Sequence, residues 1–161
     1  MISSATSQND YAGSSSTSIY AFSFYVITPA QLLVTTEVGG IITTLVLNTD
    51  YTVAQNTDIT TGGNINLLAG NLPTGTSLVI MRNVPLTQLF SFPNNGQFFP
   101  HNYELALDQL CMEIQNLQAQ LNNCIRYPFT ETQATSVLPT APNRANLDLG
   151  FDASGNAIVE A

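Results

Sequence analysis

The chain has no lysine and no tryptophan, and charged residues make up only 9% of its 161 positions. A typical soluble domain carries about 25% charged residues. The cations are Arg82, Arg126 and Arg144, against eleven acidic residues, and the formal net charge is −8. Nucleic-acid binding needs lysine and arginine to neutralise phosphates, so this composition argues against a nucleic-acid partner. A surface rich in Ser, Thr, Asn and Gln instead suits polar interfaces that form without desolvating charged pairs.

Long apolar runs are also missing. No stretch approaches the roughly 20 residues of a transmembrane helix, so no membrane partner is expected. The first ten residues lack the basic and apolar regions of a signal peptide, and we expect folding in a cytoplasm. Cys111 and Cys124 would stay reduced there. Two cysteines and one histidine are too few for a zinc site, so we expect no metal and no cofactor.

Residues 1–100 have the pattern of short strands joined by turns. Residues 19–27 alternate, with Tyr20, Phe22, Phe24 and Val26 on one face, which is typical of a half-buried strand. Two β-branched runs flank Gly39-Gly40, a pair that can take the positive φ angles of a tight hairpin turn. Further short strands are expected at 51–53, 65–67 and 78–82. This spacing predicts a mainly β fold, with a β-sandwich or barrel-like module at the N-terminus.

Residues 101–127 contain no helix breaker, and Pro128 follows them. The pattern predicts one long helix, with Asn102 as its N-cap. Apolar residues recur at alternating steps of four and three, which is the heptad spacing of a coiled coil. They are Tyr103, Leu107, Leu110, Ile114, Leu117, Leu121 and Cys124.

Two interpretations of this apolar seam compete. The seam could pack on the core of its own domain, or it could join copies of the chain. The strict 3.5-residue repeat, the Gln- and Asn-rich flanks and the prolines at both ends favour self-association. Leu and Ile are mixed at one set of seam positions, Leu107, Ile114 and Leu121, without a buried Asn, which permits a trimer. We therefore predict a homotrimeric coiled coil.

Residues 128–161 are rich in Thr, Pro and Asn and poor in core residues. We interpret them as an extended connector toward a further fibre region. One hairpin is expected there, between Leu149-Gly150-Phe151 and Ala157-Ile158-Val159.

No motif favours catalysis. His101 sits between Pro100 and Asn102 without a nucleophile elbow in the chain, so a helix-entry role is expected. Glu104 and Asp108 share a helix face, as a glycosidase carboxylate pair would. Solvation and pairing with the helix dipole explain them better. The aspartates at 10, 50, 58 and 152 lie in no calcium-loop motif and are read as turn residues. We expect no enzymatic activity.

Several segments together resemble the N-terminal, virion-anchoring region of tail fibres and tailspikes of short-tailed bacteriophages. They are 47–53, Arg82 to Gln88, Phe92 to Phe99 and Tyr103 to Gln118, and the resemblance spans about Asn9 to Pro128. It implies a trimer that docks on tail adaptor or nozzle proteins and supports host adhesion. It also implies a location in the virion tail, after assembly in the host cytoplasm.

An apolar loop is the candidate surface for docking on the tail, since so many exposed aromatic side chains would be unusual. Its residues are Leu86, Leu89, Phe90, Phe92, Phe98 and Phe99. The alternative for the loop is a lid over the β-module's own core. The alternatives for the whole chain are a carbohydrate-binding or adhesin β-domain that contacts the host directly, and a small stand-alone tail adaptor.

Overall fold

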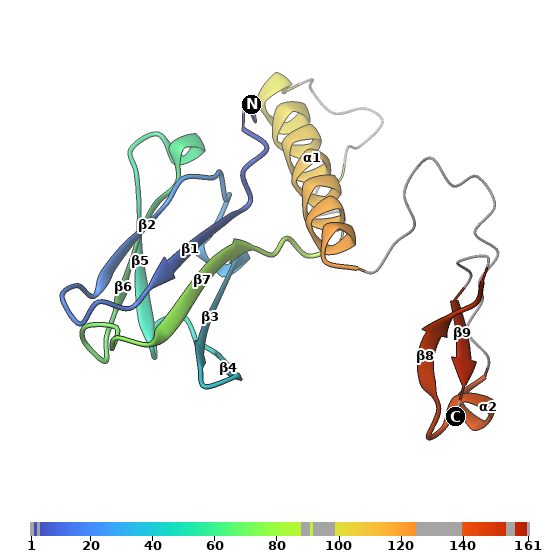
Figure 1. The fold of residues 1–161 in the computed structure, drawn as a ribbon. Helices are drawn as coiled ribbons and strands as arrows, with labels where there is room; N and C mark the ends of the chain where they lie inside the picture. The colour runs from blue at the N-terminus through green and yellow to red at the C-terminus, as the bar shows by residue number, and fades with distance from the viewer. Residues whose placement is uncertain are drawn as a thin grey trace. The chain divides into compact units, whose positions relative to one another are not determined.

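The computed structural model describes residues 2, 4–87, 91, 99–124, 140–153 and 157–160. The chain divides into two compact units, Met1–Asn123 and Cys124–Ala161, which are described separately below. The described residues of the first unit form seven strands in two antiparallel sheets and one long helix, and the prediction of a mainly β fold is confirmed (Figure 1). Neither helix in the described part of the chain is long and apolar enough to cross a membrane.

The first sheet has the strand order β1-β7-β3-β4. Its strands are β1 (Gln8–Ala12), β7 (Thr76–Arg82), β3 (Leu32–Val38) and β4 (Ile41–Thr44). The predicted hairpin at Gly39-Gly40 joins β3 to β4, with φ angles of 58° and 83° at the two glycines. The Gly40 amide donates to the Glu37 carboxylate over 2.6 Å, which closes the turn.

The second sheet has the order β2-β6-β5, with β2 (Ile19–Phe22), β6 (Gly63–Leu67) and β5 (Tyr51–Gln55). Short 3₁₀ helices at Pro29–Gln31 and Ile59–Thr61 form parts of the connections. Gly62, with φ of 88°, passes so close to the Phe22 backbone that a Cβ would lie 2.0 Å from its carbonyl oxygen. Only glycine fits this approach without moving the strand.

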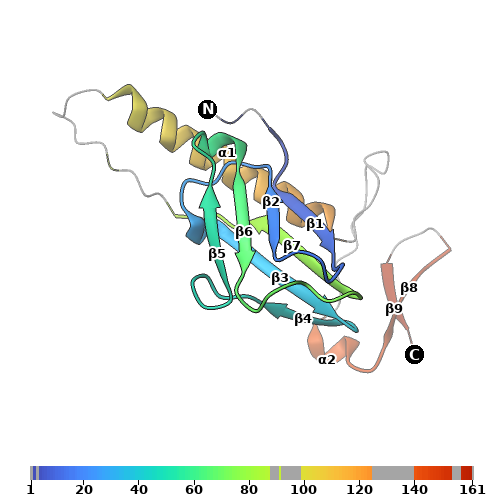
Figure 2. The same ribbon diagram turned by 90° about the vertical axis from the view of Figure 1, so that its left-hand side faces the viewer.

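Inward side chains of both sheets meet in one hydrophobic core, and the sheets lie one in front of the other in Figure 2. The face predicted from the alternation at Tyr20, Phe22, Phe24 and Val26 is buried, although β2 itself ends at Phe22. This arrangement fits the expected β-sandwich. The other core residues are Leu32, Val34, Tyr51, Ile65, Leu67, Leu72, Leu78 and Ile80.

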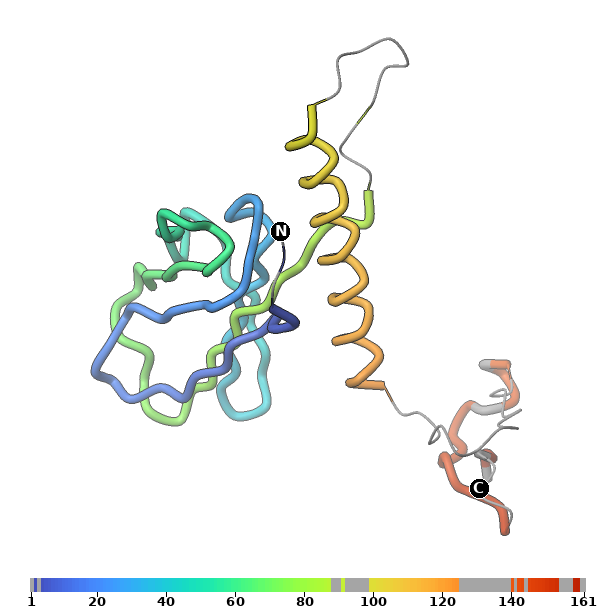
Figure 3. Tube along the Cα trace, turned by 90° about the horizontal axis from the view of Figure 1, so that it is seen from above, coloured from blue at the N-terminus to red at the C-terminus, as the bar shows by residue number. Residues whose placement is uncertain are grey.

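The long helix α1 spans Pro100–Asn122 and runs beside the β-module (Figure 3). The predicted helix was residues 101–127. The helix instead begins one residue earlier, at Pro100, and ends at Asn122. Residues 125–127 lie outside the described part of the chain. Asn102 is not the N-cap, because Pro100 occupies the first helical position, where its missing N–H costs nothing. The cap position is Phe99, whose carbonyl accepts from the Asn102 amide at 3.0 Å. Past the last turn, the Asn123 amide donates to the Gln120 carbonyl.

The second unit contains a short helix, α2 (Ala141–Arg144), and a two-stranded hairpin of β8 (Asp148–Phe151) and β9 (Ala157–Glu160). This confirms the hairpin that was expected between residues 149–151 and 157–159. The interpretation of the whole segment as extended was wrong at α2, where Pro142 occupies an early helical position that proline tolerates. Residues 128–139, 154–156 and 161 of the expected connector lie outside the described residues.

Candidate functional site

The predicted apolar seam faces solvent along α1. Leu107 is 67% exposed, Ile114 59% and Leu121 57%, and Tyr103, Leu110 and Leu117 are also exposed. The seam therefore does not pack on the core of its own domain. Cys124 is exposed but lies beyond Asn122, so it is not part of the helical stripe.

The opposite face of α1 packs on the β-module. Met112 is fully buried, and it clusters with Tyr25 and Val84. Asp108, Gln109 and Asn116 are buried on the same face. The helix thus turns a largely polar stripe inward and its apolar stripe outward, the reverse of an ordinary amphipathic surface helix.

Arg82, at the end of β7, is the centre of the contact between sheet and helix. Its guanidinium donates to the Tyr25 carbonyl at 3.1 Å and to the Gln115 side-chain oxygen, and it lies 5.9 Å from the centre of the Phe24 ring. Burial lowers the pKa of this guanidinium. Burial, and then the negative charge of Asp108, raise the pKa of the Tyr25 hydroxyl. These are the effects expected of groups held out of water at an internal junction.

Three further hydrogen bonds fix the helix to the module. The Gln109 amide donates to the Thr87 carbonyl at 2.7 Å, and the Ile2 amide donates to the Asp108 carboxylate at 3.0 Å. The Gln115 amide donates to the Ser4 carbonyl at 3.1 Å. Because hydrogen bonds are directional, they specify one rotation of α1 about its own axis. That rotation keeps the apolar seam outward.

The second predicted site is the apolar loop. Leu86 and Phe99, at its two ends, are 66% and 54% exposed. The remaining predicted residues of the loop, Leu89, Phe90, Phe92 and Phe98, lie outside the described part of the chain. The two exposed ends do not distinguish a docking surface from a lid.

The β3–β4 hairpin carries an exposed apolar surface that the sequence interpretation missed. Ile41 and Ile42 are each 72% exposed, and Val38 and Val46 are exposed as well. β4 is the edge strand of its sheet. The signal in the sequence was the pair Ile41-Ile42, because neighbours in a strand point to opposite faces and both cannot enter one core.

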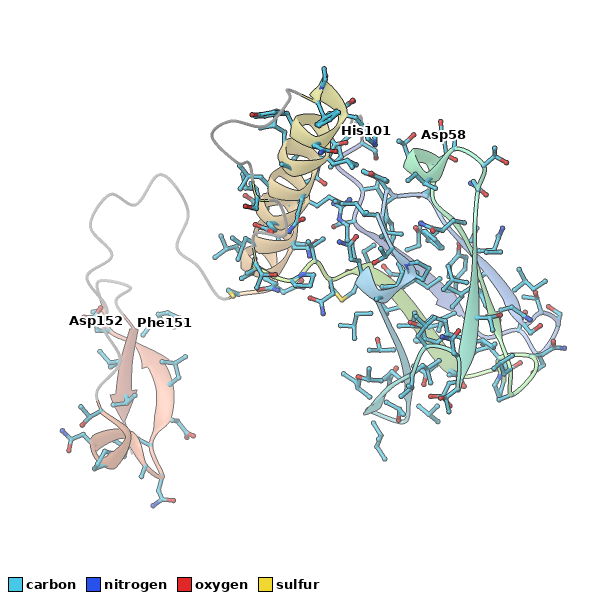
Figure 4. The ribbon with its side chains drawn as sticks, turned by 180° about the vertical axis from the view of Figure 1, so that it is seen from behind. Asp58, His101, Phe151 and Asp152 are labelled. Carbon is cyan, nitrogen blue, oxygen red and sulfur yellow. The ribbon has the colours of Figure 1, made fainter. Side chains whose placement is uncertain are left out.

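His101, Glu104 and Asp108, which were considered for catalysis, all lie in the first half of α1. His101 is exposed in the first turn of α1 (Figure 4). Asp108 is buried and accepts from a backbone amide, so the expectation that it would be solvated was wrong. Among the described residues, no three His, Cys, Asp or Glu side chains gather as metal ligands would.

A cleft of about 270 Å³ lies where β3, β6 and the loop before β7 meet. Asp50 and Asn71 are among its lining residues, and the other lining residues are Thr36, Val38, Leu45, Leu67, Ala69, Gly70, Leu72, Pro73 and Thr76. It has no aromatic wall on which a sugar ring could stack.

Comparison with known proteins gives one informative similarity. No family model matches the chain. It is 33% identical over 128 residues, or 79% of its length, to the tail spike protein of Salmonella phage epsilon15. The chain spans only 12% of the length of that relative. The similarity supports a relationship of this chain to phage tail spike proteins.

Proposed function

We propose that the chain is the N-terminal anchor of a homotrimeric phage tail fibre or tail spike. It attaches the fibre to the tail and supports host adhesion through structure rather than catalysis. The observation that supports this best is the exposed apolar stripe of α1, spaced in heptads, on a chain similar to a tail spike protein. A coiled coil is the ordinary way in which such a stripe leaves water.

The contacts of the inner face of α1 with its own β-module determine how the trimer would be built. Met112, Arg82 and Asp108 already join α1 to its own β-module. On α1, the outer seam is the face that remains for contact with other copies. The three helices therefore lie at the axis, and the three modules lie outside them. Leu107, Ile114 and Leu121 fill one set of seam positions, and Leu110 and Leu117 fill the other. The seam contains no Asn. A buried Asn at such a position can fix the number of helices in a coiled coil, so its absence leaves a trimer possible.

The β-modules would dock on tail adaptor or nozzle proteins. Two exposed apolar surfaces are available for this contact: the loop ends at Leu86 and Phe99, and the β3–β4 hairpin at Val38 and Ile41, which lie opposite each other. Exposed apolar patches on soluble proteins commonly mark interaction sites. Linking three copies raises the avidity of docking without any new contact.

A host-contacting carbohydrate-binding β-domain is the alternative from a different class. The acidic and amide groups at the cleft, Asp50 and Asn71, favour it. The lack of an aromatic wall in the cleft disfavours it. Glycan arrays separate the two functions, because an anchor should bind none of the sugars.

The proposal is tested with tail particles that lack this protein. Full-length chain is expected to decorate the particles, whereas Ile114→Asp should bind at least about 100-fold more weakly. Three carboxylates would otherwise meet in one buried layer of the seam, so the variant loses trimeric avidity. Gln118→Asp is the matched control, because it places the same charge on an exposed flank of the same helix. Equal decoration by Ile114→Asp and Gln118→Asp would contradict the proposed anchor.

A further inference from the structure

The hairpin β8–β9 of the second unit has one apolar face. Its register pairs Leu149 with Val159 and Phe151 with Ala157. Directly opposite residues lie on the same face of an antiparallel pair, and alternate residues along a strand share a face. Leu149, Phe151 and Val159 therefore lie on one side of the hairpin. Leu149 is 49% exposed and Phe151 is 61% exposed.

The other side of the hairpin carries Asp148 and Gly150 on β8, and Ile158 of β9 lies opposite Gly150. Asp148 is exposed, whereas Gly150 and Ile158 are half-buried. A carboxylate favours water, so the end of this face that carries Asp148 favours solvent.

A hairpin of two strands is marginal in water by itself. β8 and β9 form a two-stranded sheet of their own, and no other strand of the described residues pairs with them. Figure 4 shows Phe151 and Asp152 together at the end of β8. The apolar face needs a cover that two short strands cannot provide.

We propose that this cover is the same face of other copies, so that three hairpins pack together through Leu149, Phe151 and Val159. The inference rests on the trimer proposed above. The seam of α1 would hold three copies together, and only residues 123–147 separate it from β8 in each copy. A short tether gives effective concentrations in the millimolar range. Three identical apolar faces can meet at a three-fold axis while the three exposed Asp148 carboxylates stay in water.

The contact is a second surface between subunits, at a different place in the chain from the seam of α1. The seam joins copies through a helix, whereas this surface joins them through strand side chains. It accounts for an apolar hairpin face in a part of the chain that has few core residues.

Disulfide trapping in the full chain tests the proposal. In a Cys111→Ser, Cys124→Ser background, Leu149→Cys is compared with Asp148→Cys, its neighbour on the opposite face. Side chains that meet at the axis can reach the spacing of about 4–7 Å between Cα atoms that a disulfide needs. Oxidation should give mostly disulfide-linked dimers with Leu149→Cys and few with Asp148→Cys.

Sedimentation of the same variants separates the possible failures. A trimer that gives equal or no cross-linking at positions 148 and 149 would overturn the hairpin contact and leave the coiled coil intact. A monomer without cross-links would overturn both. As a second measurement, Phe151→Asp should raise the concentration at which the trimer dissociates about 10-fold or more. Asp148→Asn, on the opposite face of the same strand, should change that concentration by less than about 2-fold, and equal effects of the two variants would contradict the contact.

Discussion

Arg82 connects the sheet to the helix through one buried side chain. It is 2% exposed, and its guanidinium contacts the Tyr25 carbonyl, the Gln115 side chain and the Phe24 ring. Among the described residues its Nε has no hydrogen-bond partner, so the site is not fully satisfied. A planar guanidinium can donate in two directions at once, which a lysine ammonium on a flexible stem does less well.

Replacing Arg82 should therefore destabilise the first unit. In Arg82→Met, the Tyr25 carbonyl and the Gln115 oxygen each lose a donor, and we expect a loss of about 1–3 kcal/mol. Arg82→Lys should lose less, because it keeps the charge and at least one donor. Denaturant unfolding of both variants checks this prediction. Wild-type stability in Arg82→Met would show that the contact is dispensable.

The role of Arg82 could not be predicted from the sequence, although the segment Arg82 to Gln88 carried part of the family resemblance. A sequence shows that a cation is present but not which carbonyl a long side chain reaches. Asp108 was misread for a related reason. Its partner, the Ile2 amide, is 106 positions away in the chain.

Helix α1 has two faces with separate tasks. Met112 on the inner face is fully buried with Tyr25 and Val84, whereas Leu110 on the seam is 53% exposed. The inner face contributes to the stability of one subunit. The outer face is more than half exposed at Leu107, Leu110, Ile114 and Leu121, so these side chains contribute little until copies associate.

Truncation of the two faces should therefore give different results. Met112→Ala should lower the free energy of unfolding by about 2–5 kcal/mol, because it leaves a cavity. Leu110→Ala should lower it by less than about 0.5 kcal/mol, because its side chain is already in water. Both are measured in the Ile114→Asp background, where association is expected to be abolished. A large loss in Leu110→Ala would mean that the seam belongs to the subunit's own core.

Period and turn chemistry were sufficient to predict most elements. Alternation located the buried Tyr20, Phe22, Phe24 and Val26 but missed the burial of Tyr25, and Gly39-Gly40 located a hairpin. Heptad spacing located the apolar stripe of α1. The inner face of α1 was missed because Gln109 and Asn116 do not look like core residues, and their burial depends on partners in distant segments.

At the scale of the molecule, the β-module and α1 are not independent parts. They share the cluster of Tyr25, Val84 and Met112 and belong to one compact unit. Deleting residues 103–127 would expose Tyr25 and Val84, so a deletion would not cleanly test the helix alone. Point substitutions on the seam are the better probe.

The central claim is that the outward seam of α1 joins three copies of the chain. Sedimentation equilibrium of the full chain at micromolar concentration tests it most directly. The account predicts a species of three times the 17.3 kDa chain mass, which Ile114→Asp reduces to the mass of a single chain. A stable 17.3 kDa monomer of the unmodified chain across that range would contradict it.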